Sequence, residues 1–92
     1  MTTVDLRCEP AADGWTCLVR LTDAAGTGEH RVSVRRADLA RLAPGATDPS
    51  DLVRRSFAFL LEREPRGSIL RSFELTAIGR YFPEWERTIR RG

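Results

Sequence analysis

The sequence contains few of the side chains that build metal sites and catalytic sites. It holds a single histidine, His30, and only two cysteines, Cys8 and Cys17. The cysteine spacing matches no zinc-binding pattern, and one histidine cannot complete a four-ligand site. The GxGxxG and phosphate-loop patterns are missing as well. We therefore expect the protein to hold neither a metal nor a cofactor.

Long apolar runs are also missing. The longest, Phe57 to Leu61, is far below the roughly 20 residues that span a bilayer. The N-terminus shows no basic stretch followed by an apolar one, so we expect no signal peptide, no membrane contact and a cytoplasmic location. In that compartment we expect Cys8 and Cys17 to stay reduced, with a cross-strand disulfide as the less favoured alternative.

Lysine does not occur, so all fifteen basic residues are arginine, and thirteen acidic residues bring the formal net charge to +2. The planar guanidinium suits phosphates and carboxylates, which favours nucleic-acid binding. A GC-rich genome gives the same bias, because GC-rich codons encode arginine, alanine, glycine and proline. Since the acids nearly balance the bases, only a local patch could attract nucleic acid.

The N-terminal third alternates polar and apolar side chains, which is typical of strands with one buried face. Two such strands flank turn residues 10–14. One register places all their inward residues in apolar pairs: Val4 with Leu21, Leu6 with Val19, and Cys8 with Cys17. A one-residue slip would turn every pair to the wrong face, so this register is strongly specified.

A third strand is expected from about Glu29 to Arg35, after a glycine-containing loop. We expect it to pair with the second strand so that Leu21 faces His30, Val19 faces Val32, and Cys17 faces Val34. The result is a three-stranded antiparallel meander with one apolar face, which requires a cover.

Helices in the rest of the chain are expected to supply that cover. A short helix over 37–42 ends before Pro44, and Asp48 with Pro49 begins a longer helix that ends at Pro65. Ser68 and Thr76 are expected to cap two further short helices, before a last one. The predicted fold is α+β, a single domain of residues 1–92 with a meander over 1–36 and helices over 37–92 packed on one sheet face.

His30 is the one candidate for a general base. It lies on the apolar face of the third strand, where a histidine is more often a packing residue. We therefore predict no catalytic residue, and an enzyme that uses His30 is the least favoured function.

The opposite face of the predicted sheet carries arginines. Its basic members are Arg7, Arg20, Arg31 and Arg35. In the predicted register Arg20 and Arg31 face each other, and Asp5 lies opposite Arg20. A three-stranded sheet backed by helices can insert such a face into the DNA major groove, so anion or nucleic-acid binding here is the alternative function. An ordinary solvated face is the simpler interpretation.

A helix-turn-helix within residues 69–82 is a second nucleic-acid candidate. Glu74 stands at the turn position where glycine is usual, and Pro83 leaves the second helix barely two turns long. Plain helix packing explains this segment more simply.

Two resemblances to known proteins imply little about the function of this one. The stretches 59–65, 68–73 and 78–84, which read FLLEREP, SILRSF and IGRYFPE, resemble a group of small uncharacterised bacterial proteins. That resemblance covers about the C-terminal third, and implies a bacterial origin without an activity. The order of three strands and a helix is similar to HicB-type antitoxin domains, but this is a likeness of element order alone.

The leading hypothesis is a non-enzymatic domain that binds another protein or a second copy of itself. No catalytic constellation is present, and the C-terminal segment has more large apolar side chains than a short helix pair needs. Tyr81, Phe82 and Trp85 are the predicted interaction residues, because tyrosine and tryptophan are favoured at interfaces.

Overall fold

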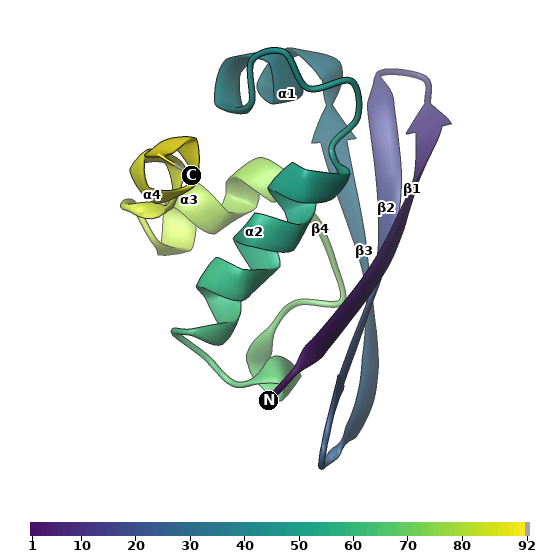
Figure 1. Ribbon diagram of the computed structural model, residues 1–92, viewed down its shortest axis with the longest axis vertical. Coiled ribbons are helices and arrows are strands. Elements are labelled where there is room, and N and C mark those ends of the chain that lie inside the picture. The colour runs from purple at the N-terminus through teal and green to yellow at the C-terminus, as the bar shows by residue number, and fades with distance from the viewer. Residues whose placement is uncertain (92) are drawn as a thin grey trace.

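The computed structural model describes residues 1–91 as a sheet with helices on one of its faces (Figure 1). Strands β1 (Thr3–Ala11), β2 (Gly14–Asp23) and β3 (Gly26–Arg35) form an antiparallel meander, to which a short strand β4 (Ser72–Glu74) is added. The α+β class is therefore confirmed. The all-antiparallel, three-stranded sheet is wrong, because β4 runs parallel to β3 at its edge.

The predicted register of the first hairpin is confirmed. The structure pairs Val4 with Leu21, Leu6 with Val19, and Cys8 with Cys17. The register of the second hairpin is wrong by two residues, since His30 lies opposite Val19, Val32 opposite Cys17, and Val34 opposite Trp15. A shift of two keeps every side chain on its predicted face, because strand side chains alternate with a period of two.

The short strand β4 replaces the helix that Ser68 was expected to cap. The Arg31 amide donates to the Arg71 carbonyl at 2.7 Å, and the Phe73 ring lies 6.0 Å from that of Phe57. Burial of Phe73 against α2 and pairing with β3 thus hold the segment extended. A strand in the middle of residues 69–82 also rules out the helix-turn-helix candidate, which is the less favoured interpretation of this segment.

The remaining elements cover one face of the sheet (Figure 1). Helix α2 begins after Asp48, whose carboxylate accepts the Ser50 amide at 2.8 Å. The chain after α2 forms short elements, as far as α4 at the C-terminal end. The helical elements are α1 (Arg36–Leu42), α2 (Ser50–Leu61), η1 (Arg66–Ser68), η2 (Leu75–Ala77), α3 (Ile78–Tyr81) and α4 (Trp85–Arg91). Within residues 1–91 no helix is both long and apolar enough to cross a bilayer.

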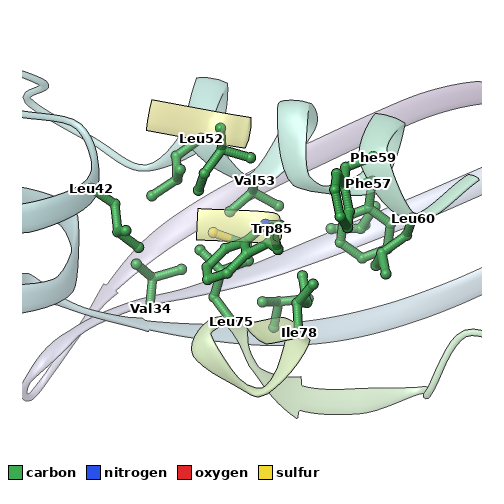
Figure 2. Packing of buried hydrophobic residues seen from close by; sticks show 14 of the residues in the cluster. Val34, Leu42, Leu52, Val53, Phe57, Phe59, Leu60, Leu75, Ile78 and Trp85 are labelled. Atoms are coloured by element: carbon green, nitrogen blue, oxygen red, sulfur yellow. The ribbon is translucent and has the colours of Figure 1, made fainter. Parts of the chain in front are cut away.

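One hydrophobic core fills the space between the sheet and the helices. Trp85 is 1% exposed and lies amid the core side chains labelled in Figure 2. Its indole Nε1 donates to the Ser56 hydroxyl at 3.2 Å, and that hydroxyl donates to the Leu52 carbonyl at 2.8 Å. The one polar atom of the ring is therefore satisfied within the core.

Cys8 and Cys17 form a disulfide between β1 and β2. The expectation of reduced thiols is therefore wrong. The two residues are directly opposite in the hairpin register, with their Cα atoms 4.0 Å apart, so the pairing of the strands itself brings the sulfur atoms together. A disulfide that persists is typical of oxidising compartments, which weighs against the predicted cytoplasmic location.

Candidate functional site

The four predicted anion-binding arginines do lie on the outer face of the sheet, which is the face turned away from the helices. All of Arg7, Arg20, Arg31 and Arg35 are exposed. The predicted contact of Arg20 with Arg31 is wrong, because the two-residue shift puts Glu29 opposite Arg20 and Leu18 opposite Arg31. Arg20 instead forms an ion pair with Glu29 at 2.9 Å.

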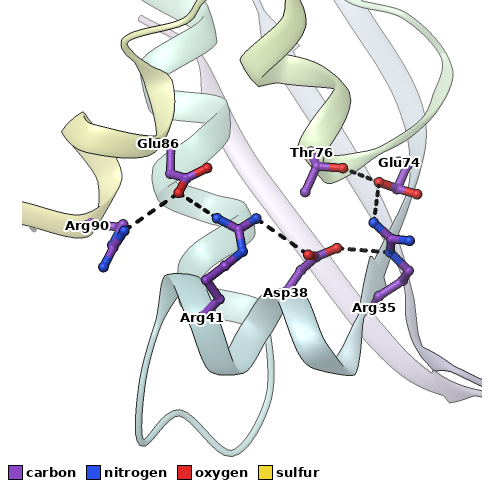
Figure 3. A network of polar contacts seen from close by, with 7 residues as sticks. All are labelled: Arg35, Asp38, Arg41, Glu74, Thr76, Glu86 and Arg90. Carbon is purple, nitrogen blue, oxygen red and sulfur yellow. Dashed lines mark hydrogen bonds and ion pairs between the residues drawn. The ribbon is translucent and has the colours of Figure 1, made fainter.

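Arg35 is also neutralised. It contacts the Asp38 carboxylate at 3.0 Å and Glu74 at 3.5 Å, in the network of Figure 3. The Asp38 carboxylate, as a hydrogen-bond acceptor, raises the pKa of the Arg35 guanidinium above its ordinary value. Among the side chains of residues 1–90, Arg7 and Arg31 form no ion pair, and they flank Leu18 in one row across the strands. The outer face is thus a mixed surface with two free cations.

An apolar pocket of about 340 Å³ lies between the end of α2, the segment 68–73 and α3. Tyr81 and Leu70 border it with exposed fractions of 69% and 53%, the largest of the large hydrophobic side chains of the described chain except Met1. The apolar lining residues are Leu60, Ile69, Leu70, Phe73, Ala77, Ile78, Tyr81 and Phe82. We call this site the Tyr81 pocket.

The structure separates the three predicted interaction residues. Tyr81 and Phe82 line the Tyr81 pocket, where the Phe82 ring stands edge-on to Phe59 at 5.8 Å. Trp85 is a core residue, so its predicted place in an exposed patch is wrong. Sequence reasoning did not find Leu70 as a lining residue, because it placed Leu70 inside a packed helix.

Two polar side chains border the Tyr81 pocket, Glu64 and Ser68. Glu64 forms no ion pair with any side chain of residues 1–90, although its neighbour Arg63 is held by Glu62 and Glu84 at 3.3 Å each. The pocket therefore combines an apolar interior with one free negative charge at its rim.

His30 is 5% exposed, and its ring lies 5.7 Å from the Phe57 ring on the inner face of the sheet. Its Nδ1 lies 2.7 Å from the Leu70 carbonyl oxygen. A carbonyl only accepts, so Nδ1 carries the proton. An orienting carboxylate, which a general base of the serine-hydrolase type uses, is not the partner here. Among residues 1–91 no group of histidine, cysteine and acidic side chains could hold a metal.

Asp23 fixes the turn between β2 and β3 to the chain after α2. Its carboxylate accepts the Ala25 and Gly26 amides at 2.8 and 3.1 Å and the Arg66 Nε at 3.0 Å. The hydrogen bond from Arg66 is the main reason why the pKa of Asp23 is lowered from 3.8. The pKa of Glu84 is lowered from 4.5, mainly by a backbone hydrogen bond and then by Arg63.

These lowered pKa values predict acid-sensitive stability. A carboxyl whose folded pKa lies below its unfolded value stabilises the fold above the unfolded value, and that contribution is lost as pH falls through the folded pKa. We expect urea unfolding midpoints to be level near neutral pH and to drop below about pH 4. Asp23→Asn should flatten part of that drop, whereas Asp5→Asn, on exposed β1, should keep the wild-type profile. Equal profiles for wild type and Asp23→Asn would contradict the role of Asp23.

Comparison of the chain with protein-family models, curated proteins and solved structures found no match. The resemblances carried by residues 59–84 and by the order of elements therefore stay predictions. Function has to be argued from the sites themselves.

Proposed function

We propose that this protein is a non-enzymatic protein-binding domain whose Tyr81 pocket takes an apolar side chain of a partner protein. The observation that carries the proposal is the exposure of Leu70 and Tyr81 around a concave apolar site of about 340 Å³. Burying an aromatic or aliphatic anchor in such a pocket is how interfaces concentrate their binding energy. Tyrosine suits its rim, because the ring buries apolar area while the hydroxyl stays in water.

The charge at the rim selects the kind of partner. Glu64 borders the pocket without an ion pair to the side chains of residues 1–90, so a cation next to the apolar anchor gains an attraction that an anion does not. The proposed occupant is a peptide segment with a large apolar residue followed or preceded by arginine or lysine. A second copy of this arginine-rich chain is one source of such a segment. Sedimentation of the purified protein distinguishes self-association from binding to a different protein.

Capped dipeptides test the pocket directly. We expect acetyl-Phe-Arg-amide to shift the amide resonances of residues 68–73 and 78–82, with weaker shifts from Phe-Glu and from Ala-Arg. The first comparison removes the charge match and the second removes the anchor. Leu70→Asp should weaken Phe-Arg binding by about tenfold or more, since it places a charge in the apolar lining.

The matched control is Leu18→Asp. Leu18 is the other exposed leucine of the described chain, with 38% of its surface accessible, but it lies on the outer face of the sheet. Its replacement should leave dipeptide binding unchanged. Equal weakening by both variants, or binding of Ala-Arg as tight as that of Phe-Arg, would overturn the proposal.

Nucleic-acid binding through the outer face stays the alternative, on a narrower basis than the sequence indicates. A shallow hollow of about 690 Å³ there is lined by Arg7, Arg31 and Arg71, but Asp5 and the Arg20–Glu29 ion pair also line it, so its positive charge is partly offset. Ion pairing of Arg20 with Glu29 and of Arg35 with Asp38 removes two of the four predicted contacts. Each lost phosphate contact lowers both the affinity and its salt dependence.

A further inference from the structure

A second hollow, of about 380 Å³, lies where the first residues of β3 pass the segment 66–71. Two guanidinium groups line it, those of Arg66 and Arg71, together with His30. Its one acidic lining residue, Glu29, is already paired with Arg20. We call this site the basic hollow. It shares only Ile69 with the Tyr81 pocket, and it adjoins the outer-face hollow, with which it shares Glu29, His30 and Arg71.

Arg66 brings unused donors to the basic hollow. A guanidinium has five N–H groups, and among the side chains of residues 1–90 Arg66 donates only through its Nε–H, to Asp23 at 3.0 Å. Its terminal nitrogens lie against Gly26 and Gly28, at 3.7 and 3.0 Å from where a Cβ would stand on each glycine. Because neither glycine has a side chain, the Arg66 guanidinium has room to pack against the backbone at these two positions.

His30 brings an unused acceptor. Its Nδ1–H donates to the Leu70 carbonyl, so the neutral ring has a lone pair on Nε2. Nε2 is buried and has no hydrogen-bond partner in the described chain. It lies 3.6 Å from the Cβ position of Gly28, the same point that Arg66 approaches to 3.0 Å. The unpaired Nε2 of His30 and the free N–H groups of Arg66 therefore both lie beside Gly28.

The edge of β3 adds backbone donors. The Arg31 amide points toward β4, where it meets Arg71, and hydrogen-bonding direction alternates along a strand. The amides of Glu29 and Thr27 therefore point the same way. Strand β4 pairs only with residues Arg31 to Ser33, so it does not cover them.

We propose that the basic hollow binds inorganic phosphate. The ionised oxygens accept from Arg66, Arg71 and the exposed β3 amides, and the hydroxyl of HPO₄²⁻ donates to His30 Nε2. The Arg66 guanidinium and Nε2 both approach the Cβ position of Gly28, so both groups reach an anion that enters there. Sulfate has the same shape but no proton to donate at neutral pH, so His30 discriminates against it.

Titration of the full chain at constant ionic strength tests the proposal. We expect inorganic phosphate to shift the amides of Thr27, Gly28 and Gly67 and the His30 ring nitrogens in a saturable way. Sulfate should bind at least about tenfold more weakly, because it leaves a buried acceptor unpaired. A phosphate monoester such as glycerol phosphate loses its second proton near pH 6, so at neutral pH it should also bind more weakly than inorganic phosphate.

Three variants assign the residues. Arg66→Ala should weaken phosphate binding about tenfold or more, as the loss of a charged hydrogen bond does. Gly28→Ala, whose methyl group would stand 3.0 Å from Arg66 and 3.6 Å from His30, should weaken it without removing a charge. Arg90→Ala, which removes the same charge from α4, should leave binding within about twofold.

Four results would overturn the assignment: no saturable shifts, sulfate bound as tightly as phosphate, a monoester bound as tightly as phosphate, or equal effects of Arg66→Ala and Arg90→Ala. Spectra of each variant show whether it is folded, and Gly28→Ala keeps the proposal testable if Arg66→Ala unfolds the chain. The dipeptide assay reads a different pocket, so failure of either proposal leaves the other intact.

Discussion

Trp85→Ala is expected to lower the free energy of unfolding by about 3–5 kcal/mol. The ring is 1% exposed, and its Cε3 atom stands 3.5 Å from where a Cβ would lie on Gly79. Removing it leaves a cavity between α2 and α4 and removes the donor to Ser56. Because small domains are stable by only about 5–15 kcal/mol, the variant should lose a large part of its stability.

Urea unfolding followed by circular dichroism measures this effect. The matched control is Trp15→Ala, which removes the only other tryptophan. Trp15 is half-buried on β2 and stacks under Arg36 at 4.8 Å, so its loss should have a clearly smaller effect. Trp85→Phe should fall between the two, because it keeps most of the buried ring. A Trp85→Ala variant as stable as Trp15→Ala would show that the C-terminal helix does not belong to the core.

Removal of the Cys8–Cys17 disulfide is expected to lower the free energy of unfolding by about 2–3 kcal/mol. The bond closes a loop with a sequence separation of 9, and loss of that cross-link returns conformational entropy to the unfolded chain. Unfolding in the presence and absence of a reductant measures the difference. The β-hairpin itself should survive in the folded state, since its register also rests on the pairs of Val4 with Leu21 and Leu6 with Val19.

The double variant Cys8→Ala, Cys17→Ala is the control. Its stability should equal that of the reduced wild-type protein, and the reductant should have no further effect on it. Titration of free thiols in the unfolded wild-type protein should find none before reduction. Two free thiols, with no change on adding reductant, would restore the expectation of reduced cysteines and support the cytoplasmic location.

The face of each strand could be predicted from the sequence, but the position along the strand could be predicted only for the first hairpin. There, three apolar pairs agree on one register. In the second hairpin, Gly28 lies opposite Leu21, so an inward position carries no apolar side chain. Apolar matching then favours His30 opposite Leu21, two residues too far. The tight turn that Asp23 stabilises with two backbone amides decides the register instead.

Strand β4 could not be predicted from local pattern. Three residues are too few for a periodicity, and Ile69, Leu70 and Phe73 have helical spacing. Its conformation depends on the open edge of β3, which is distant in the sequence. The same reason explains the candidate sites: aromatic character indicated Tyr81 and Phe82, but only the return of the chain to β3 places Leu70 beside them.

Trp85 shows that residue type alone does not predict whether a side chain lies in the core or at an interface. Tryptophan is favoured both in cores and at interfaces, and the sequence around Trp85 does not distinguish the two. The Ser56 hydroxyl decides, because it gives the indole N–H a partner inside the protein, 29 residues away in the chain.

The hydrogen bond from His30 to the Leu70 carbonyl joins residues that are 40 positions apart. The first hairpin needs only a short loop to close, whereas this contact must wait until α2 and the following chain have returned to the sheet. Loop-closure entropy therefore favours forming the meander first and docking segment 66–74 late. In the native protein the His30 contact, the Asp23–Arg66 ion pair and the pairing of β4 with β3 hold this segment in place. The segment borders both the Tyr81 pocket and the basic hollow. Docking of this segment on the sheet therefore forms both sites, and its release disrupts both.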